Sequence, residues 1–89
     1  MFARKDNYSI GIEVDHSQIR KKSIEKLNDL KPDLAIFLLK GKKINRKGNY
    51  LRSKQIRVNS LLIHLPKKKV QKIPIVKQRY KNLKEVKSH

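Results

Sequence analysis

The sequence predicts a small α+β protein, because a strand-like pattern and a helix-like pattern of apolar residues follow one another in a short chain. Residues 8–14 alternate between apolar and polar types, which is typical of a half-buried strand. From residue 17 the apolar residues change to a helical period. A chain of 89 residues suits one domain with a small hydrophobic core.

The first strand presents Tyr8, Ile10, Ile12 and Val14 on one face, and we expect that face to be buried. Asp15 follows, with Gln18 three residues later. This spacing is similar to a capping box, in which the Asp15 side chain accepts the amide of the third helical residue. A helix is therefore predicted over about residues 17–31, and Pro32 either interrupts it or restarts it.

Residues 34–39 are all apolar, so their pattern fits either a buried strand or a continuation of the helix. Helix is slightly favoured, because Leu34, Phe37 and Leu38 extend the apolar stripe formed by Ile24 and Leu27. Six residues are too few to span a membrane, which takes roughly 20. The sequence therefore gives no reason to expect a membrane partner.

The second half of the chain predicts less regular structure. Residues 40–50 form a basic loop, residues 55–65 a strand, and residues 70–76 an edge strand, since Pro74 cannot donate to a neighbouring strand. Residues 79–86 suit a short helix. The predicted organisation is a folded strand–helix unit over residues 1–39, followed by a basic loop, hairpin and tail over residues 40–89 that is ordered mainly on RNA.

Charge is divided very unevenly along the chain. Residues 1–33 hold seven basic and six acidic side chains, whereas residues 34–84 hold sixteen basic and no acidic ones. A net charge of +17 favours a polyanionic partner, which relieves the repulsion between the cations. This segregation predicts a surface that binds the phosphate backbone of a nucleic acid.

Catalytic chemistry finds little support in the sequence. There is no cysteine, which excludes thiol catalysis and Cys-based zinc sites. Val14-Asp15-His16 is similar to the first half of an HNH nuclease motif, but the Asn and His that should follow at close spacing are missing. We therefore expect no enzymatic activity, no metal and no cofactor.

Lysine outnumbers arginine by 18 to 6, and lysine suits phosphate contacts better than base recognition. We expect RNA to be bound through its backbone, with base stacking on tyrosines beside the cations. The candidate RNA-binding residues are Lys40, Lys42, Lys43, Arg46, Lys47, Arg52, Lys54, Arg57, Lys67, Lys68, Lys69, Lys72, Lys77, Arg79, Tyr80 and Lys81. Two alternatives stay open: a DNA-binding protein encoded by a phage or plasmid, and an inhibitor that binds another protein through residues 34–39, although we expect that run to be buried.

Two stretches, Ile10-Gly11-Ile12-Glu13-Val14-Asp15-His16 with its following helix and Ile63-His64-Leu65-Pro66-Lys67-Lys68-Lys69, resemble the small-subunit ribosomal protein S-ten family of organelles. The resemblance implies a ferredoxin-like body with an extended basic hairpin that enters ribosomal RNA. It also implies a structural role in translation, in the small subunit of the mitochondrial matrix ribosome. Ribosomal RNA and neighbouring ribosomal proteins would be the partners, and the chain would not function as a free monomer. The Arg-Ser-Pro-His run of the family reads Lys77-Gln78-Arg79-Tyr80 here.

The excess of Lys, Ile and Asn is typical of AT-rich genes, which occur in organelle genomes and in some bacteria and their phages. A mitochondrially encoded protein is therefore the expectation. The cytoplasm of an AT-rich bacterium or its phage is the alternative.

Overall fold

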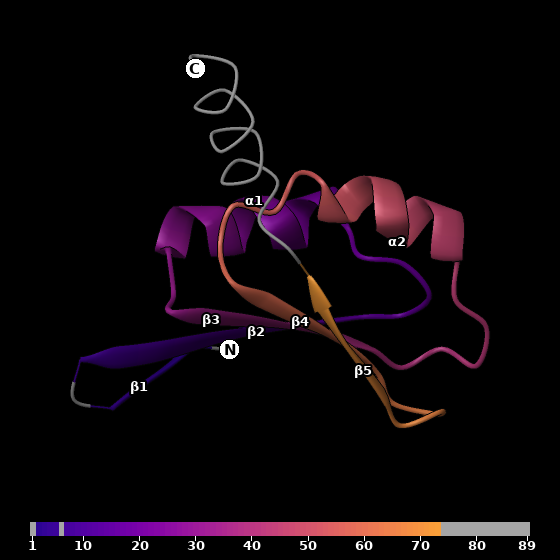
Figure 1. Cartoon of the computed structure of the whole chain (residues 1–89), viewed down its shortest axis with the longest axis horizontal. Coiled ribbons are helices and arrows are strands. Elements are labelled where there is room, and N and C mark those ends of the chain that lie inside the picture. The colour runs from indigo at the N-terminus through magenta and orange to yellow at the C-terminus, as the bar shows by residue number, and fades with distance from the viewer. Residues whose placement is uncertain (1, 6, 74–89) are drawn as a thin grey trace, which may run out of the picture.

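Five strands and two helices make up the part of the chain that the computed structural model describes, residues 2–5 and 7–73 (Figure 1). In chain order the elements are β1 (Phe2–Lys5), β2 (Tyr8–Asp15), α1 (Lys21–Leu30), β3 (Leu34–Leu39), α2 (Arg46–Ser53), β4 (Ser60–His64) and β5 (Lys69–Ile73). The predicted helix over residues 79–86 lies outside the described residues, as do the candidate RNA-binding residues Lys77, Arg79, Tyr80 and Lys81.

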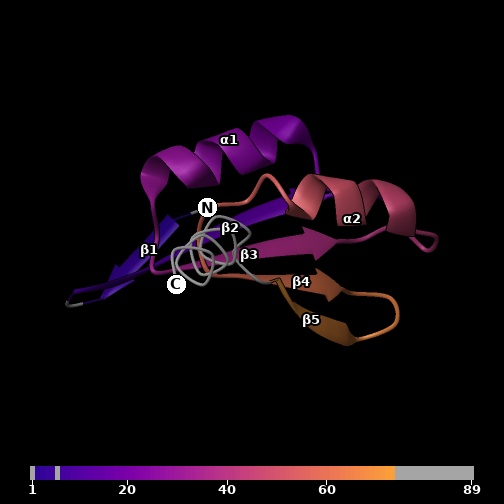
Figure 2. The ribbon, with the colours of Figure 1, turned by 45° about the horizontal axis from the view of Figure 1, so that its top comes forward.

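The strands form one sheet in chain order, β1-β2-β3-β4-β5. The central strands β2, β3 and β4 are parallel, and the outer pairs β1–β2 and β4–β5 are antiparallel. Helices α1 and α2 make the two crossovers between parallel strands, and both lie on the same face of the sheet (Figure 2). This two-layer body confirms the predicted α+β class and is consistent with a ferredoxin-like α+β body. Among the described residues, no helix is long and apolar enough to cross a membrane.

The hydrophobic core lies between the two helices and the face of the sheet that they cover. Every second residue of the central strand β3 points into it, so that Ala35, Phe37 and Leu39 are fully buried. The other buried apolar residues come from α1, from the segments before and after the helices, and from β4 and β5: Ile19, Ile24, Leu27, Ile56, Leu62 and Ile73.

The burial predicted for the first strand was wrong, because β2 turns its polar side chains towards the helices. Ser9, Gly11 and Asp15 are buried on the helix side, whereas Tyr8 and Val14 are about half exposed on the opposite face. Gly11 explains this choice of face. A Cβ atom at Gly11 would lie 2.6 Å from Cδ2 of Leu27, so the small residue lets α1 pack directly on the strand.

Residues 34–39 form strand β3, so the slight preference for a helix was wrong. The helix α1 ends at Leu30, because Lys31 adopts a left-handed conformation at the C-cap and Pro32 follows. The next six residues lie at the centre of the sheet and pair with β2 on one side and β4 on the other. Ala35, Phe37 and Leu39 of this run are buried in the core, whereas Leu34, Ile36 and Leu38 on the other face are only partly buried.

The basic loop predicted for residues 40–50 was also wrong in its second half, which belongs to α2. Asn45 begins this helix as its N-cap, since its side chain accepts a hydrogen bond from the Gly48 amide at 2.9 Å. The strand predicted from residue 55 starts only at Ser60. Residues 46–73 thus add α2 to the helix layer and β4 and β5 to the sheet, so the folded body extends beyond the predicted boundary at residue 39.

Candidate nucleic-acid interface

A groove of about 770 Å³ lies between α2 and the β4–β5 hairpin on the helix side of the sheet. Helix α2 forms one wall, and the side chains of the two strands form the floor. The lining residues are Ile44, Arg46, Asn49, Tyr50, Ser53, Lys54, Leu62, His64, Lys67, Lys69, Gln71 and Ile73. All of them lie in the part of the sequence that holds no acidic residue.

The groove exists because β5 extends the sheet beyond the cover of the helices. Its register places Lys69 beside His64 and Gln71 beside Leu62, so the four side chains share the helix side of the sheet. Within the described chain no helix follows β5, and its residues are exposed except for Ile73. The result is an open groove beside α2, in whose floor the apolar residues Leu62 and Ile73 are nearly buried.

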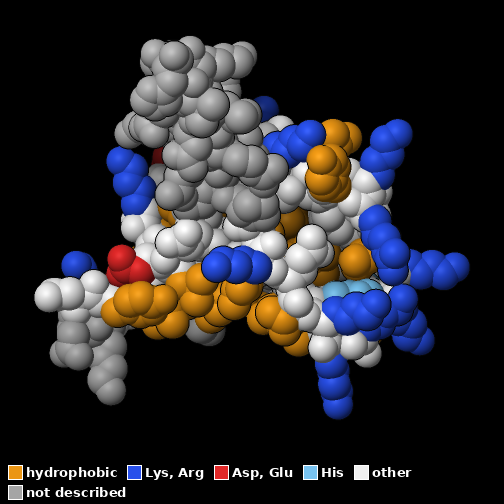
Figure 3. Space-filling view, in the orientation of Figure 1, with side chains coloured by type: hydrophobic (Ala, Val, Ile, Leu, Met, Phe, Trp, Pro, Cys, Tyr) orange, Lys and Arg blue, Asp and Glu red, His pale blue; other side chains and the backbone are white. Residues whose placement is uncertain are grey.

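Four cations surround the groove. Arg46 and Lys54 come from α2 and its C-cap, and Lys67 and Lys69 come from the turn after β4 and the start of β5. All four residues are exposed. Figure 3 shows Lys and Arg side chains gathered at the end of the molecule where the β4–β5 turn and the start of α2 lie. Because no acidic residue occurs between residues 34 and 84, no carboxylate from that stretch neutralises this end.

Tyr50 gives the groove an aromatic surface. Its side chain is 62% exposed, and Nζ of Lys54 lies 4.7 Å from the centre of the ring. The ammonium group is attracted to the electron-rich ring face, which favours one orientation of the tyrosine. An exposed aromatic ring beside cations can stack on a base while the neighbouring cations bind phosphates.

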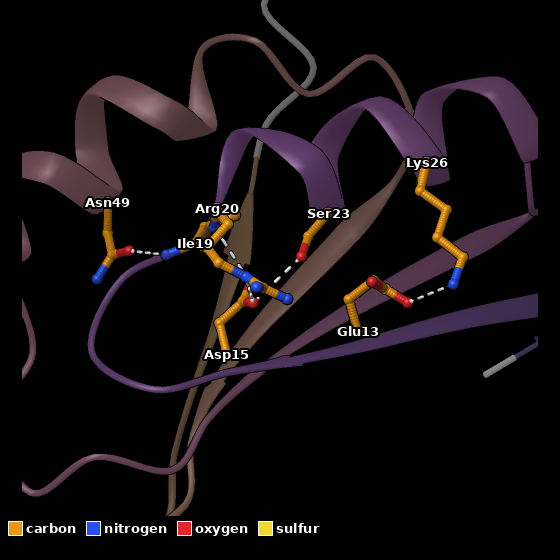
Figure 4. Close-up of polar contacts among 7 residues, drawn as sticks. All are labelled: Glu13, Asp15, Ile19, Arg20, Ser23, Lys26 and Asn49. Atoms are coloured by element: carbon orange, nitrogen blue, oxygen red, sulfur yellow. Dashed lines mark hydrogen bonds and ion pairs between the residues drawn. The ribbon is translucent and has the colours of Figure 1, made fainter.

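The polar contacts of Asn49 hold α2 in its place beside the loop that follows β2 (Figure 4). Asn49 is buried, accepts a hydrogen bond from the Ile19 amide at 2.7 Å and donates to the Ser17 carbonyl at 3.4 Å. The backbone amide of Asn45 also donates to the Ser17 carbonyl, at 3.0 Å. These bonds fix the wall of the groove relative to the sheet.

Replacing Asn49 with Ala is expected to lower the free energy of unfolding by about 2 kcal/mol, because the buried Ile19 amide loses its acceptor. Urea denaturation followed by circular dichroism measures this change. Lys47→Ala on the exposed side of the same helix is the control and should change the free energy by less than about 0.5 kcal/mol. Equal stability of the two variants would show that Asn49 does not hold α2.

The carboxyl ends of the three parallel strands meet in one row, where Asp15, Leu39 and His64 are neighbours in register. Nε2 of His64 donates to the Gly41 carbonyl at 2.7 Å, since a carbonyl oxygen can only accept. This bond ties the loop after β3 to the floor of the groove. The sequence does not reveal it, because residues 41 and 64 are brought together only by the sheet.

Asp15 does not cap α1 in the way that the sequence predicted. Its carboxylate accepts hydrogen bonds from the backbone amide of Arg20 at 3.1 Å, from Nε of Arg20 at 2.6 Å and from the Ser23 hydroxyl at 3.2 Å (Figure 4). Gln18 instead accepts from the side chain of Asn45 at 3.0 Å. The helix begins later than predicted, at Lys21, so the amides that Asp15 was expected to cap lie in the preceding loop.

The remaining candidate residues do not all lie at the groove. Lys40, Lys42 and Lys43 are exposed in the segment after β3, and Lys47 is exposed on α2. Arg52 is partly buried and lines a smaller hollow beside residues 16–20. Arg57 precedes β4, Lys68 lies in the β4–β5 turn, and Lys72 alternates onto the face of β5 opposite to the groove.

Within residues 2–5 and 7–73, no group of three or more His, Cys, Asp or Glu side chains is placed to hold a metal ion. His16 is exposed after the end of β2. The buried carboxylate nearest to it in the sequence, Asp15, is engaged with Arg20 and Ser23. Comparisons with protein-family models, curated proteins and solved structures found no match.

Proposed function

We propose that the protein binds RNA through its phosphate backbone in the groove between α2 and the β4–β5 hairpin. The observation that carries this proposal is the convergence of four cations on one open groove whose walls come from a stretch of sequence without acidic residues. Such a surface attracts a polyanion and releases its counterions on binding.

The exposed ring of Tyr50 favours a single strand over a regular duplex. Leu62 and Ile73 line the floor of the groove but are nearly buried, so Tyr50 provides the surface for stacking. Unpaired bases can stack on such a surface, whereas paired bases are stacked on one another inside a duplex. We therefore propose an unpaired RNA segment, with its phosphates on Arg46, Lys54, Lys67 and Lys69.

The finer proposal is a structural constituent of the small ribosomal subunit in mitochondria. It is supported by the resemblance of residues 10–16 and 63–69 to the S-ten family. The second of these stretches spans the end of β4, the following turn and the first residue of β5. It contributes His64, Lys67 and Lys69 to the groove.

Fluorescence anisotropy with single-stranded RNA, duplex RNA and duplex DNA of the same length and sequence tests the proposal. Single-stranded RNA should bind most tightly, and the logarithm of its affinity should fall with the logarithm of salt concentration with a slope of about −3, as expected for four contacts with a single strand. Tighter binding to duplex DNA would favour the DNA-binding alternative. An affinity that does not depend on salt would contradict backbone binding altogether.

Association with the ribosome needs a separate experiment. The tagged chain is added to mitochondrial lysate and followed through a sucrose gradient. It should sediment with the small subunit and leave it only at high salt, because the contacts are electrostatic. Sedimentation at the top of the gradient at every salt concentration would refute the ribosomal role. It would leave the proposal of RNA binding in the groove unaffected.

A further inference from the structure

The face of the sheet opposite to the helices is apolar and uncovered in the described chain. The alternation of the strands places Ile12, Ile36 and Leu61 in one row of this face and Val14, Leu38, Ile63 and Val70 in the next. Ala3, Ile10 and Leu34 form a third row. Figure 3 shows hydrophobic side chains along the lower margin of the molecule, on the side of the sheet away from the helices.

Several side chains on this face are strongly exposed to solvent. Val14 is 49% exposed and Val70 is 62% exposed, and the apolar residues of the central strands are partly exposed. The sequence led us to expect that residues 34–39 are buried, yet Leu34, Ile36 and Leu38 lie on this open face. We call it the open sheet face, defined by the ten residues of the three rows.

We propose that two copies of the chain pack against each other through the open sheet face and form a two-fold symmetric dimer. Two sheets of identical sequence have the same twist, so their apolar faces can be stacked with strands nearly aligned and side chains interdigitating, as in a β-sandwich. A two-fold interface needs a surface that is complementary to itself. An apolar face without a charged centre meets this condition, because apolar side chains can pack against their own kind.

The distribution of charge permits a second copy in spite of the net charge of +17. No charged residue lies in the three apolar rows except Lys72, at the β5 edge of the row of Ile36 and Leu61. The cations of the groove lie on the opposite side of the sheet, with the helices. Two stacked sheets lie about 10 Å apart, so each groove would be separated from the other by the thickness of both sheets and largely screened at physiological salt.

The area of the open sheet face is sufficient for a reversible dimer. Five strands at a spacing of about 4.8 Å, with five to eight residues of about 3.3 Å each in the longer strands, give a planar footprint of roughly 500 Å². A stable interface of standard size buries about 800 Å² on each partner, and transient ones bury less. We therefore expect a dimer that dissociates on dilution.

Such a dimer would direct its two grooves away from each other, because both grooves lie on the helix sides. If the groove binds RNA as proposed, one dimer bridges two RNA segments. This consequence rests on the proposed function, whereas the dimer itself does not.

Sedimentation equilibrium over a range of protein concentrations tests the dimer on the whole chain. The wild-type mass should rise from one chain to two, and Leu38→Thr should weaken association about tenfold or more, since it removes apolar contact from the centre of the interface. Leu51→Thr is the matched control, because Leu51 is 52% exposed on α2, away from the open sheet face. Ile63→Thr is a second variant of the same face with good strand propensity, and thermal melting monitors the folding of each variant.

A wild-type chain that stays monomeric at every concentration would overturn the dimer, as would association that survives both Leu38→Thr and Ile63→Thr. Measurements at several salt concentrations distinguish a failure of the dimer from a failure of RNA binding. Salt should weaken RNA binding but should preserve or strengthen the dimer, because it screens the repulsion between the two copies. Leu38→Thr should bind single-stranded RNA with the affinity per chain of the wild type.

Discussion

Reversing the charge of Lys67 and Lys69 together is expected to weaken the binding of single-stranded RNA by about 100-fold. The two residues follow the carboxyl end of β4 and line the same groove as Arg46 and Lys54. The change to Glu removes two phosphate contacts and adds two repelling carboxylates. Because each contact with a single strand adds about 0.7 to the salt slope, the slope should become shallower by about 1.4. Anisotropy titrations at several salt concentrations measure both quantities.

The matched control reverses two exposed cations near the amino ends of the parallel strands, Lys31 before β3 and Arg57 before β4. This variant has the same net charge as the Lys67→Glu/Lys69→Glu variant. It should lose some affinity through the general field of the protein, but its salt slope should stay close to that of the wild type. Equal losses in the two variants would mean that net charge, and not the groove, determines binding.

Phe37→Ala is expected to lower the free energy of unfolding by about 3–5 kcal/mol, which is a large part of the total for a domain of this size. Phe37 is fully buried at the centre of β3 and lies between Glu13 and Leu62 in register. Its removal leaves a cavity beneath the helices that the surrounding strands cannot close. Thermal and urea denaturation followed by circular dichroism measure the loss.

The neighbouring residue provides the control. Leu38 points to the open sheet face and is only partly buried, so Leu38→Ala should cost clearly less than Phe37→Ala when both are measured at concentrations where the chain is monomeric. The pair tests which face of β3 the helices cover. A larger loss of unfolding free energy for Leu38→Ala would mean that the core lies on the open sheet face, and would contradict the structure.

The α+β class and the positions of β2, α1 and the β4–β5 pair were predictable, because their apolar periods are local properties of the sequence. The buried face of β2 was not. Its apolar residues suggested the core side, but the close packing of Leu27 on Gly11 requires the opposite orientation. A contact between residues sixteen positions apart leaves no signal in the alternation of the strand.

The groove was predictable in its charge and not in its geometry. Lys67 and Lys69 were expected to bind RNA because they are basic, as was Lys72. Only the register of β5 shows that Lys69 faces the groove while Lys72 faces away from it. The wall of the groove was missed, since Gly48 and the many basic residues made residues 46–50, the first part of α2, look like a loop. The signal that was available is Asn45, whose side chain is suited to begin a helix.

The placement of RNA in the groove is tested most directly by nuclear magnetic resonance, with backbone amide shifts followed while single-stranded RNA is added to the labelled chain. The largest changes should fall on Tyr50, Lys54, Lys67, Lys69 and Gln71, which line the groove from α2, its C-cap, the turn after β4, and β5. Lys31 and Arg57 should change little. Shifts spread evenly over all exposed cations, or concentrated on the open sheet face, would contradict binding in the groove.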